Sequence, residues 1–147
     1  MKIAVLGAGP GGYEAAIYAA KKGAEVVLIE KQTGELGGTC LNRGCIPTKA
    51  FLASYDTLET VENAKDFGVN ISGEVTVDFK FIQDRKKKVV ATLVKGIAFL
   101  MKKNGVSVLN GFGKLVDRNT IDVTKEDGTV ETVKADYIIL ATGSVPS

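Results

Sequence analysis

The sequence contains no histidine and only two cysteines among its 147 residues. So few cysteines cannot form the framework of a secreted, disulfide-stapled domain, and we therefore expect the reducing cytoplasm, where a disulfide would be catalytic or transient. A structural zinc site needs about four cysteine or histidine ligands, which this chain cannot supply. We expect no metal site.

The sequence also lacks a long apolar run and a strong excess of either charge. No stretch approaches the roughly 18 apolar residues of a membrane span, and Met1 and Lys2 lead directly into a strand pattern rather than a signal peptide. Lysine and arginine number 19 against 17 acidic residues, and the basic cluster at residues 85–88 is typical of a solvated helix face. We expect a soluble protein with neither a membrane nor a nucleic-acid partner.

What the sequence does contain favours a single domain over residues 1–147, because about 45% of the residues are apolar and the chain is short. Residues 3–6 and 26–29 are β-branched runs on either side of an alanine-rich helical pattern. This arrangement predicts a strand–helix–strand unit with parallel strands. Further short strands are predicted at residues 106–109, 113–116, 120–124, 130–133 and 137–141, with a hairpin turn at Asp127-Gly128.

Two helical segments are predicted in the middle of the chain. Residues 41–63 are expected to be mostly helical, and residues 66–73 to form a loop. Residues 78–103 predict a long amphipathic helix that Asp78 caps. The apolar residues expected on buried helix faces are Ile46, Ala50, Leu52, Ala53, Leu58 and Val61 in the first segment, and Ile82, Val89, Val90, Leu93, Val94, Ile97, Leu100 and Met101 in the second.

Together these elements predict an α/β fold, a Rossmann-like domain with a central parallel sheet, a long amphipathic helix and a small antiparallel β-meander. The chain stops soon after its last predicted strand, where an α/β enzyme normally continues. We therefore expect its end to be a cut.

A glycine-rich turn joins the first predicted strand to the first predicted helix. Gly7, Gly9 and Gly12 have the GxGxxG spacing, which suits a tight turn, a close approach of pyrophosphate and close helix–strand packing. Glu30 ends the second strand, where a carboxylate accepts hydrogen bonds from a ribose and repels a ribose phosphate. The pattern predicts a dinucleotide site without separating FAD from NAD. The alternative is that the glycines only form a tight turn.

The two cysteines, Cys40 and Cys45, stand five positions apart. In a regular helix this spacing separates the Cα atoms by roughly 8 to 9 Å, whereas a disulfide needs less than about 7 Å. If the cysteines pair, the backbone between them is irregular, as Gly44 and Pro47 allow. Pro47 also places Cys45 near a helix N-terminus, where a thiolate is stabilised. Two inert buried thiols are the alternative.

The stretch GGTCLNRGCIPTK resembles the flavin-dependent pyridine nucleotide disulfide oxidoreductases. The glycine turn, Glu30, GFGK at residues 111–114 and ATGS at residues 141–144 extend the resemblance over the whole chain. Leu41 and Ile46 favour the lipoamide branch of the family over its mercuric and glutathione reductases, which more often have valines there. Arg43, where many relatives have valine, departs from the pattern.

The resemblance implies that FAD binds along the glycine turn. Cys45 would face the flavin as a thiolate, Cys40 would exchange with the substrate, and Lys49 would stabilise negative charge on reduced flavin. The cofactor-binding residues that the resemblance implies are Gly7, Gly9, Pro10, Gly12, Glu30, Lys31, Gly38, Thr39, Lys49, Gly113, Thr142, Gly143 and Ser144.

The resemblance also implies a reaction and its partners. The complete enzyme would oxidise dihydrolipoamide through the disulfide and FAD, with NAD⁺ as hydride acceptor. It would be a homodimer serving the lipoyl domain of a 2-oxo acid dehydrogenase or glycine cleavage complex. The family takes its base from a histidine in a C-terminal domain, so we expect these 147 residues alone not to turn over. Another disulfide reductase and a non-catalytic nucleotide-binding module are the alternatives.

Overall fold

The computed structural model describes residues 1–144, and the last three residues of the predicted domain lie outside this range. Its central element is a four-stranded parallel sheet in the order β3-β2-β1-β7. The strands are β1 (Lys2–Leu6), β2 (Glu25–Glu30), β3 (Ser107–Asn110) and β7 (Tyr137–Leu140). The predicted central parallel sheet is confirmed.

A second sheet holds three antiparallel strands in the order β4-β5-β6. These are β4 (Phe112–Asp117), β5 (Thr120–Thr124) and β6 (Val130–Lys134). The hairpin turn predicted at Asp127-Gly128 is present, with Gly128 at a φ of 81° and the Asp127 carboxylate accepting from the Thr129 amide at 2.9 Å. The predicted small meander is therefore confirmed.

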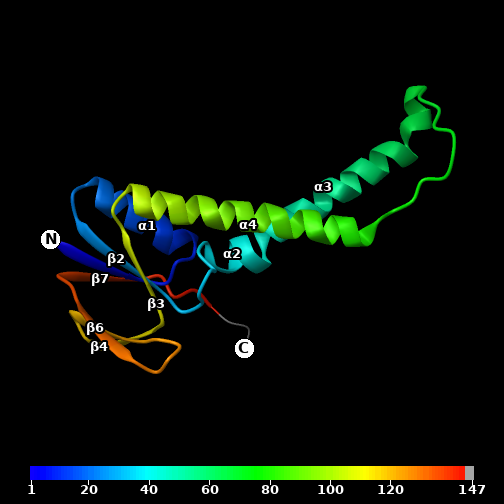
Figure 1. Cartoon of the computed structure of the whole chain (residues 1–147). Helices are drawn as coiled ribbons and strands as arrows, with labels where there is room; N and C mark the ends of the chain where they lie inside the picture. Colours follow the sequence, from blue (N-terminus) through cyan, green and yellow to red (C-terminus); the bar gives the residue numbers. More distant parts are fainter. Residues whose placement is uncertain (145–147) are drawn as a thin grey trace.

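The parallel sheet lies between a helical layer and the small sheet (Figure 1). Helices α1 (Pro10–Lys21) and α4 (Phe79–Lys103) cover one face, where Val5 and Leu28 pack with Ile97. On the other face Ala4 and Ile29 pack against Ile121, Val123 and Val133 of the small sheet. Because both faces are covered, β1 is apolar at successive positions instead of alternating with polar residues.

The segment predicted as one mostly helical stretch, residues 41–63, divides at Gly44. Helix α2 (Gly38–Arg43) ends there, and α3 (Cys45–Glu62) begins with the next residue. A short 3₁₀ helix, η1 (Ala64–Phe67), follows and was not predicted. The predicted cap of the long helix is confirmed, since the Asp78 carboxylate accepts a 2.8 Å hydrogen bond from the Phe81 amide.

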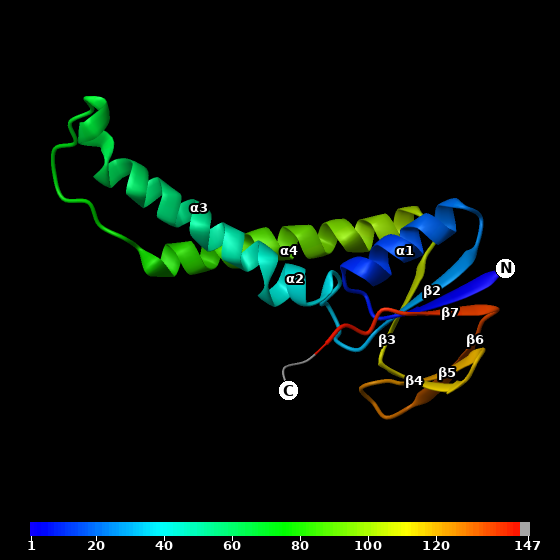
Figure 2. The same ribbon diagram turned by 180° about the vertical axis from the view of Figure 1, so that it is seen from behind.

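Helices α3 and α4 form a hairpin that projects beyond the sheets (Figures 1 and 2). Ala50, Ile97 and Met101 are buried as predicted. Four other predicted core residues are exposed instead, because each of these two helices buries only one narrow stripe, in α4 the stripe that holds Ile97 and Met101. These exposed residues are Leu52, Ala53, Leu93 and Leu100. Within residues 1–144, no helix is long and apolar enough to cross a bilayer.

Candidate functional site

The glycine turn lies between β1 and α1, as its spacing predicts. Gly7 has a φ of +102°, which a residue with a side chain rarely adopts. Gly12 lies one turn into α1, where an added Cβ would overlap the carbonyl oxygen of Gly7 and stand 2.9 Å from its carbon. This contact lets α1 pack directly on the end of β1 and brings its N-terminus to the edge of the sheet.

Glu30 connects the end of β2 to the glycine turn. Its carboxylate accepts hydrogen bonds from the Ala8 amide at 2.8 Å and from the Gln32 amide at 3.0 Å. Each carboxylate oxygen has a second lone pair, so Glu30 retains acceptor capacity toward a ligand. The residue thus shapes the turn as well as lining the site.

Glu30→Gln is expected to destabilise the fold by about 1 to 2 kcal/mol, because one amide would then face an NH₂ group instead of an oxygen. Urea denaturation measures the change. Glu25→Gln is the matched control: Glu25 begins the same strand, is exposed and forms a surface ion pair with Lys2, at 2.9 Å. Equal stability of the two variants would contradict the structural role of Glu30.

A cavity of about 520 Å³ opens where the carboxyl ends of the parallel strands meet. Its lining contains most of the predicted site residues, from segments more than a hundred positions apart in the sequence. The predicted residues in the lining are Gly7, Gly9, Pro10, Glu30, Lys31, Gly38, Thr39, Cys40, Gly113, Thr142, Gly143 and Ser144. Three predicted residues, Gly12, Cys45 and Lys49, are not part of the lining.

Several lining residues were not predicted as site residues. They include Ala8, Gln32, Glu35, Arg43, Gly111 and Phe112. Ala8 lies within the glycine motif and Phe112 within GFGK, so both motifs held the relevant signal. In the sequence Arg43 stands out only as a departure from the family pattern, and Gln32 and Glu35 belong to no motif.

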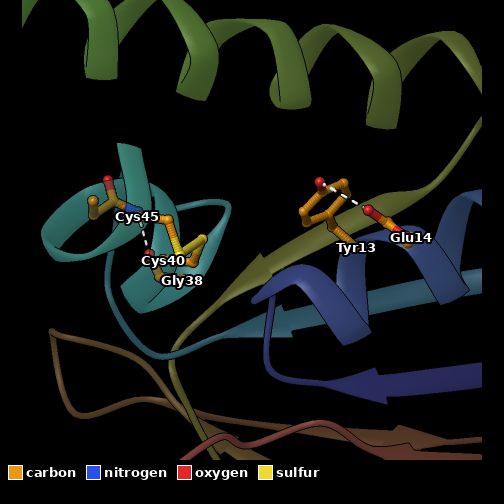
Figure 3. The surroundings of a disulfide bond; sticks show 6 residues. Tyr13, Glu14, Gly38, Cys40 and Cys45 are labelled. Carbon is orange, nitrogen blue, oxygen red and sulfur yellow. Dashed lines mark hydrogen bonds between the residues drawn. A yellow bond between two sulfur atoms is a disulfide. The ribbon is translucent and has the colours of Figure 1, made fainter. Parts of the chain in front are cut away.

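Cys40 and Cys45 form a disulfide, with their Cα atoms 4.8 Å apart (Figure 3). The predicted irregularity is present, because Gly44 separates α2 from α3 with φ −128° and ψ −112°. Cys45 is the first residue of α3, which confirms its predicted position at a helix N-terminus. Cys45 is exposed and Cys40 is half-buried; Lys49 is exposed on the first turns of α3.

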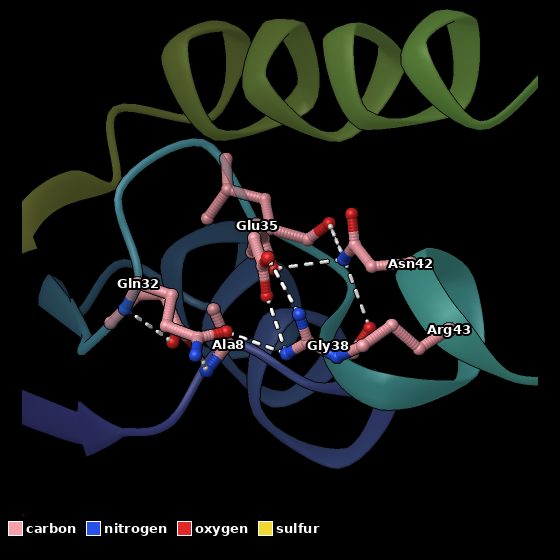
Figure 4. Close-up of polar contacts among 8 residues, drawn as sticks. Ala8, Gln32, Glu35, Gly38, Asn42 and Arg43 are labelled. Carbon is pink, nitrogen blue, oxygen red and sulfur yellow. Dashed lines mark hydrogen bonds and ion pairs between the residues drawn. The ribbon is translucent and has the colours of Figure 1, made fainter. Parts of the chain in front are cut away.

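Two residues between the cysteines, Asn42 and Arg43, form hydrogen bonds to the segment that precedes α2 and to the first residue of α2 (Figure 4). The Asn42 amide donates to the carbonyl oxygens of Glu35, Leu36 and Gly38 at 3.1, 3.3 and 2.9 Å. The Arg43 guanidinium donates to both carboxylate oxygens of Glu35, at 2.7 and 2.6 Å. It also donates to the Gln32 side-chain oxygen at 2.6 Å.

Tyr13 of α1 lies in the surroundings of the disulfide (Figure 3). Burial raises the pKa of its phenol above the ordinary value, and the hydrogen bond that the phenol donates to Glu14 adds to the rise. Tyr13 is therefore a neutral hydrogen-bonding group at neutral pH. Within residues 1–144, no three metal-ligating side chains come together.

Gly9 lies where the cavity meets the N-terminus of α1. Packing within residues 1–144 leaves room for a side chain at position 9, because the nearest atom that an added Cβ would meet beyond its chain neighbours is Gly38 Cα, at 4.0 Å. Gly9 nevertheless lines the cavity at the N-cap of α1, the kind of position at which GxGxxG folds bind a pyrophosphate. The fold and site define a nucleotide-binding α/β domain with a disulfide at the edge of its cavity.

Comparison with known proteins shows the family to which this chain belongs. The family model for pyridine nucleotide-disulphide oxidoreductases matches residues 1–147, so the chain belongs to that family. It is 50% identical over 143 residues to a dihydrolipoyl dehydrogenase of Acholeplasma laidlawii. It is 43% identical over 147 residues to one of Bacillus subtilis. The crystal structure of LpdA from Mycobacterium tuberculosis superposes with a TM-score of 0.90 at 29% identity.

These matches cover nearly all of this chain but a minor part of each relative. The match to the Acholeplasma laidlawii protein covers 97% of this chain and 40% of that protein. The match to the Bacillus subtilis protein covers 99% of this chain and 31% of that protein. The structural match covers 100% of the chain and 32% of LpdA. The chain therefore spans well under half the length of the relatives it matches.

Proposed function

We propose that this chain is the FAD-binding and disulfide-bearing part of a dihydrolipoyl dehydrogenase. The observation that carries the proposal is that Cys40, one half of the disulfide, lines the same cavity as the glycine turn and Glu30. The fold and the family agree with a flavoprotein, and the curated relatives that we compared carry this name.

The chain's own part in the proposed reaction is thiol–disulfide exchange. A thiolate of dihydrolipoamide attacks one sulfur of the Cys40–Cys45 bond, which breaks as a mixed disulfide forms. The second substrate thiol then displaces the enzyme sulfur. The products are lipoamide, now a cyclic disulfide, and two reduced cysteines, so the substrate loses the two electrons and two protons that the protein pair gains.

Residues of the cavity would hold FAD. Gly7, Gly9 and Pro10 line the cavity and would surround the pyrophosphate, Glu30 would accept from the ribose, and Gly113 would lie near the adenine. Thr142, Gly143 and Ser144 would line a further part of the cofactor. When bound, FAD supplies the hydride chemistry that links a dithiol to NAD⁺. Lys49 is proposed as the cation near the reactive flavin nitrogen.

The proposed partners are those of the whole enzyme. Dihydrolipoamide would arrive on a lipoyl domain of a 2-oxo acid dehydrogenase or glycine cleavage complex, NAD⁺ would accept the hydride, and the enzyme would be a homodimer. Residues 1–147 contain one glycine motif and no histidine. We therefore expect no sustained NAD⁺-dependent oxidation of dihydrolipoamide by these residues alone, and sustained turnover would contradict this part of the proposal.

The direct test is spectroscopic. After reconstitution with FAD, one equivalent of a dithiol is expected to produce a long-wavelength absorption band, because a reduced cysteine thiolate beside the flavin donates charge to it. Thiol alkylation and mass spectrometry confirm that the pair is reduced. A protein with bound FAD and reduced cysteines but no such band would contradict the proposal.

A further inference from the structure

The disulfide joins two helices that Gly44 alone separates, so its reduction removes a covalent link at a break in the backbone. In a working redox pair the two thiols must then stay close enough to re-form the bond. Given the proposed redox role of Cys40 and Cys45, some contact of the turn must hold the two thiols together.

Arg43 stands between the two cysteines in sequence, three residues after Cys40 and two before Cys45. It is the last residue of α2, so anchoring it restrains both sides of the break. Its guanidinium forms a two-pronged ion pair with Glu35 and a third hydrogen bond with Gln32. Such fork geometry fixes direction as well as distance, which a single lysine ammonium cannot do.

The two partners of Arg43, Glu35 and Gln32, are themselves held in place by hydrogen bonds of their segment. Glu35 and Gln32 belong to the segment between β2 and α2, where the Gln32 amide donates to Glu30 at 3.0 Å and the Gly37 amide donates to the Ala8 carbonyl at 2.8 Å. The ion pair and these hydrogen bonds therefore connect the disulfide turn to the glycine turn (Figure 4), and Gln32, Glu35 and Arg43 all line the cavity. The side chain of Arg43 is 54% exposed and that of Glu35 31%, so the pair forms at the surface.

We propose that Arg43, through Glu35 and Gln32, is a positioning residue that keeps the reduced cysteines in the geometry of the disulfide. In the oxidised protein the S–S bond already imposes this geometry. In the reduced protein the ion pair limits the freedom that the open turn gains, and it thereby favours re-formation of the bond. Removing the pair makes the disulfide easier to reduce.

The test measures the equilibrium constant for reduction of Cys40–Cys45 in glutathione or dithiothreitol buffers. The full chain is used without FAD, and the reduced fraction is counted by acid quench, alkylation and mass spectrometry. Arg43→Ala is expected to raise the constant about three- to fivefold, since partly exposed pairs of this kind stabilise by up to about 1 kcal/mol. Glu35→Ala is expected to do the same, and the double variant no more than either alone.

Matched controls separate positioning from general disturbance. Arg118→Ala removes another exposed arginine, in the turn between β4 and β5, and is expected to leave the constant unchanged. Arg43→Lys is expected to give an intermediate value, because it keeps the charge without the fork. Combining Glu35→Arg with Arg43→Glu restores the pair in reverse and is expected to return the constant toward that of the unaltered chain.

Salt gives an independent readout. At 1 M NaCl the screening length falls to about 3 Å, so the difference between Arg43→Ala and the unaltered chain is expected to shrink. If Arg43→Ala folds poorly by circular dichroism, Glu35→Gln, which keeps the side-chain shape, is expected to shift the constant in the same direction by less.

Two results would overturn the inference: a constant for Arg43→Ala equal to that for Arg118→Ala, or additive effects of Arg43→Ala and Glu35→Ala. Neither result bears on the thiolate–flavin band, which is measured with FAD present. A missing band with an intact Arg43 effect would instead reject the proposed function alone.

Discussion

Cys45→Ser is expected to abolish the long-wavelength band that appears when the FAD-loaded chain is reduced, and Cys40→Ser is expected to show that band without any added dithiol. In Cys40→Ser the remaining sulfur, Cys45, cannot pair and stays at the first residue of α3. Backbone amides at a helix N-terminus stabilise a thiolate, which is the form that donates charge. The loss in Cys45→Ser is therefore expected to be complete.

The structure makes this pair of variants informative, because two of its features point in opposite directions. The helix N-terminus favours Cys45 as the thiolate, whereas the cavity lining contains Cys40 and not Cys45. Absorption spectra of the two variants after FAD reconstitution show which cysteine is the thiolate beside the flavin. A band retained in Cys45→Ser and lost in Cys40→Ser would exchange the proposed roles, and FAD fluorescence titration checks that both variants bind the cofactor.

Gly12→Ala is expected to destabilise the chain by about 3 kcal/mol and to weaken FAD binding, because close backbone packing leaves no room for a methyl group. The added carbon would overlap the Gly7 carbonyl oxygen and approach the Ala141 Cβ to 3.4 Å. Helix α1 would have to move away from β1, taking its N-terminal amides out of the cavity. Urea denaturation and fluorescence titration with FAD measure the two effects.

Gly11→Ala is the matched control for Gly12→Ala. Gly11 is the neighbouring residue of the same helix, but a Cβ there meets no atom within 4 Å. Since alanine favours helix over glycine by up to about 1 kcal/mol, stability is expected to stay the same or rise slightly. A similar loss of stability in both variants would contradict this explanation. It would show that alanine is unfavourable anywhere in the first turn of α1, and not because of the contact with Gly7.

The two cysteines show how much of the site could be predicted from residue spacing alone. Their spacing predicted that pairing requires an irregular backbone, and the structure places that irregularity at Gly44. The same reasoning left two inert thiols as an alternative, because spacing states only what pairing would require. The resemblance to the oxidoreductase family, and not the spacing, selected the disulfide.

The exposed helix faces show where local reasoning failed. Leu52 and Leu100 have helical periodicity that predicts burial, yet they are 52% and 39% exposed. Periodicity describes the helix itself and contains no information on how far the helix extends past its neighbours. Helix α3 and the N-terminal part of α4 pack on each other beyond the sheet, whereas the C-terminal part of α4 covers the sheet and buries only the stripe that holds Ile97 and Met101 (Figure 2).

The sequence by itself determined the local features of this protein: the strand–helix–strand unit, the glycine turn, the Asp78 cap and the Asp127-Gly128 hairpin. Each is specified by residue types that stand close together in the sequence, so its pattern is visible along the chain. Only the tertiary structure decided the cavity and the partners of Arg43. Parallel strand order brings residues 6–10, 111–113 and 141–144 to one edge of the sheet. The direction of a long side chain such as Arg43 depends on the carboxylate within its reach.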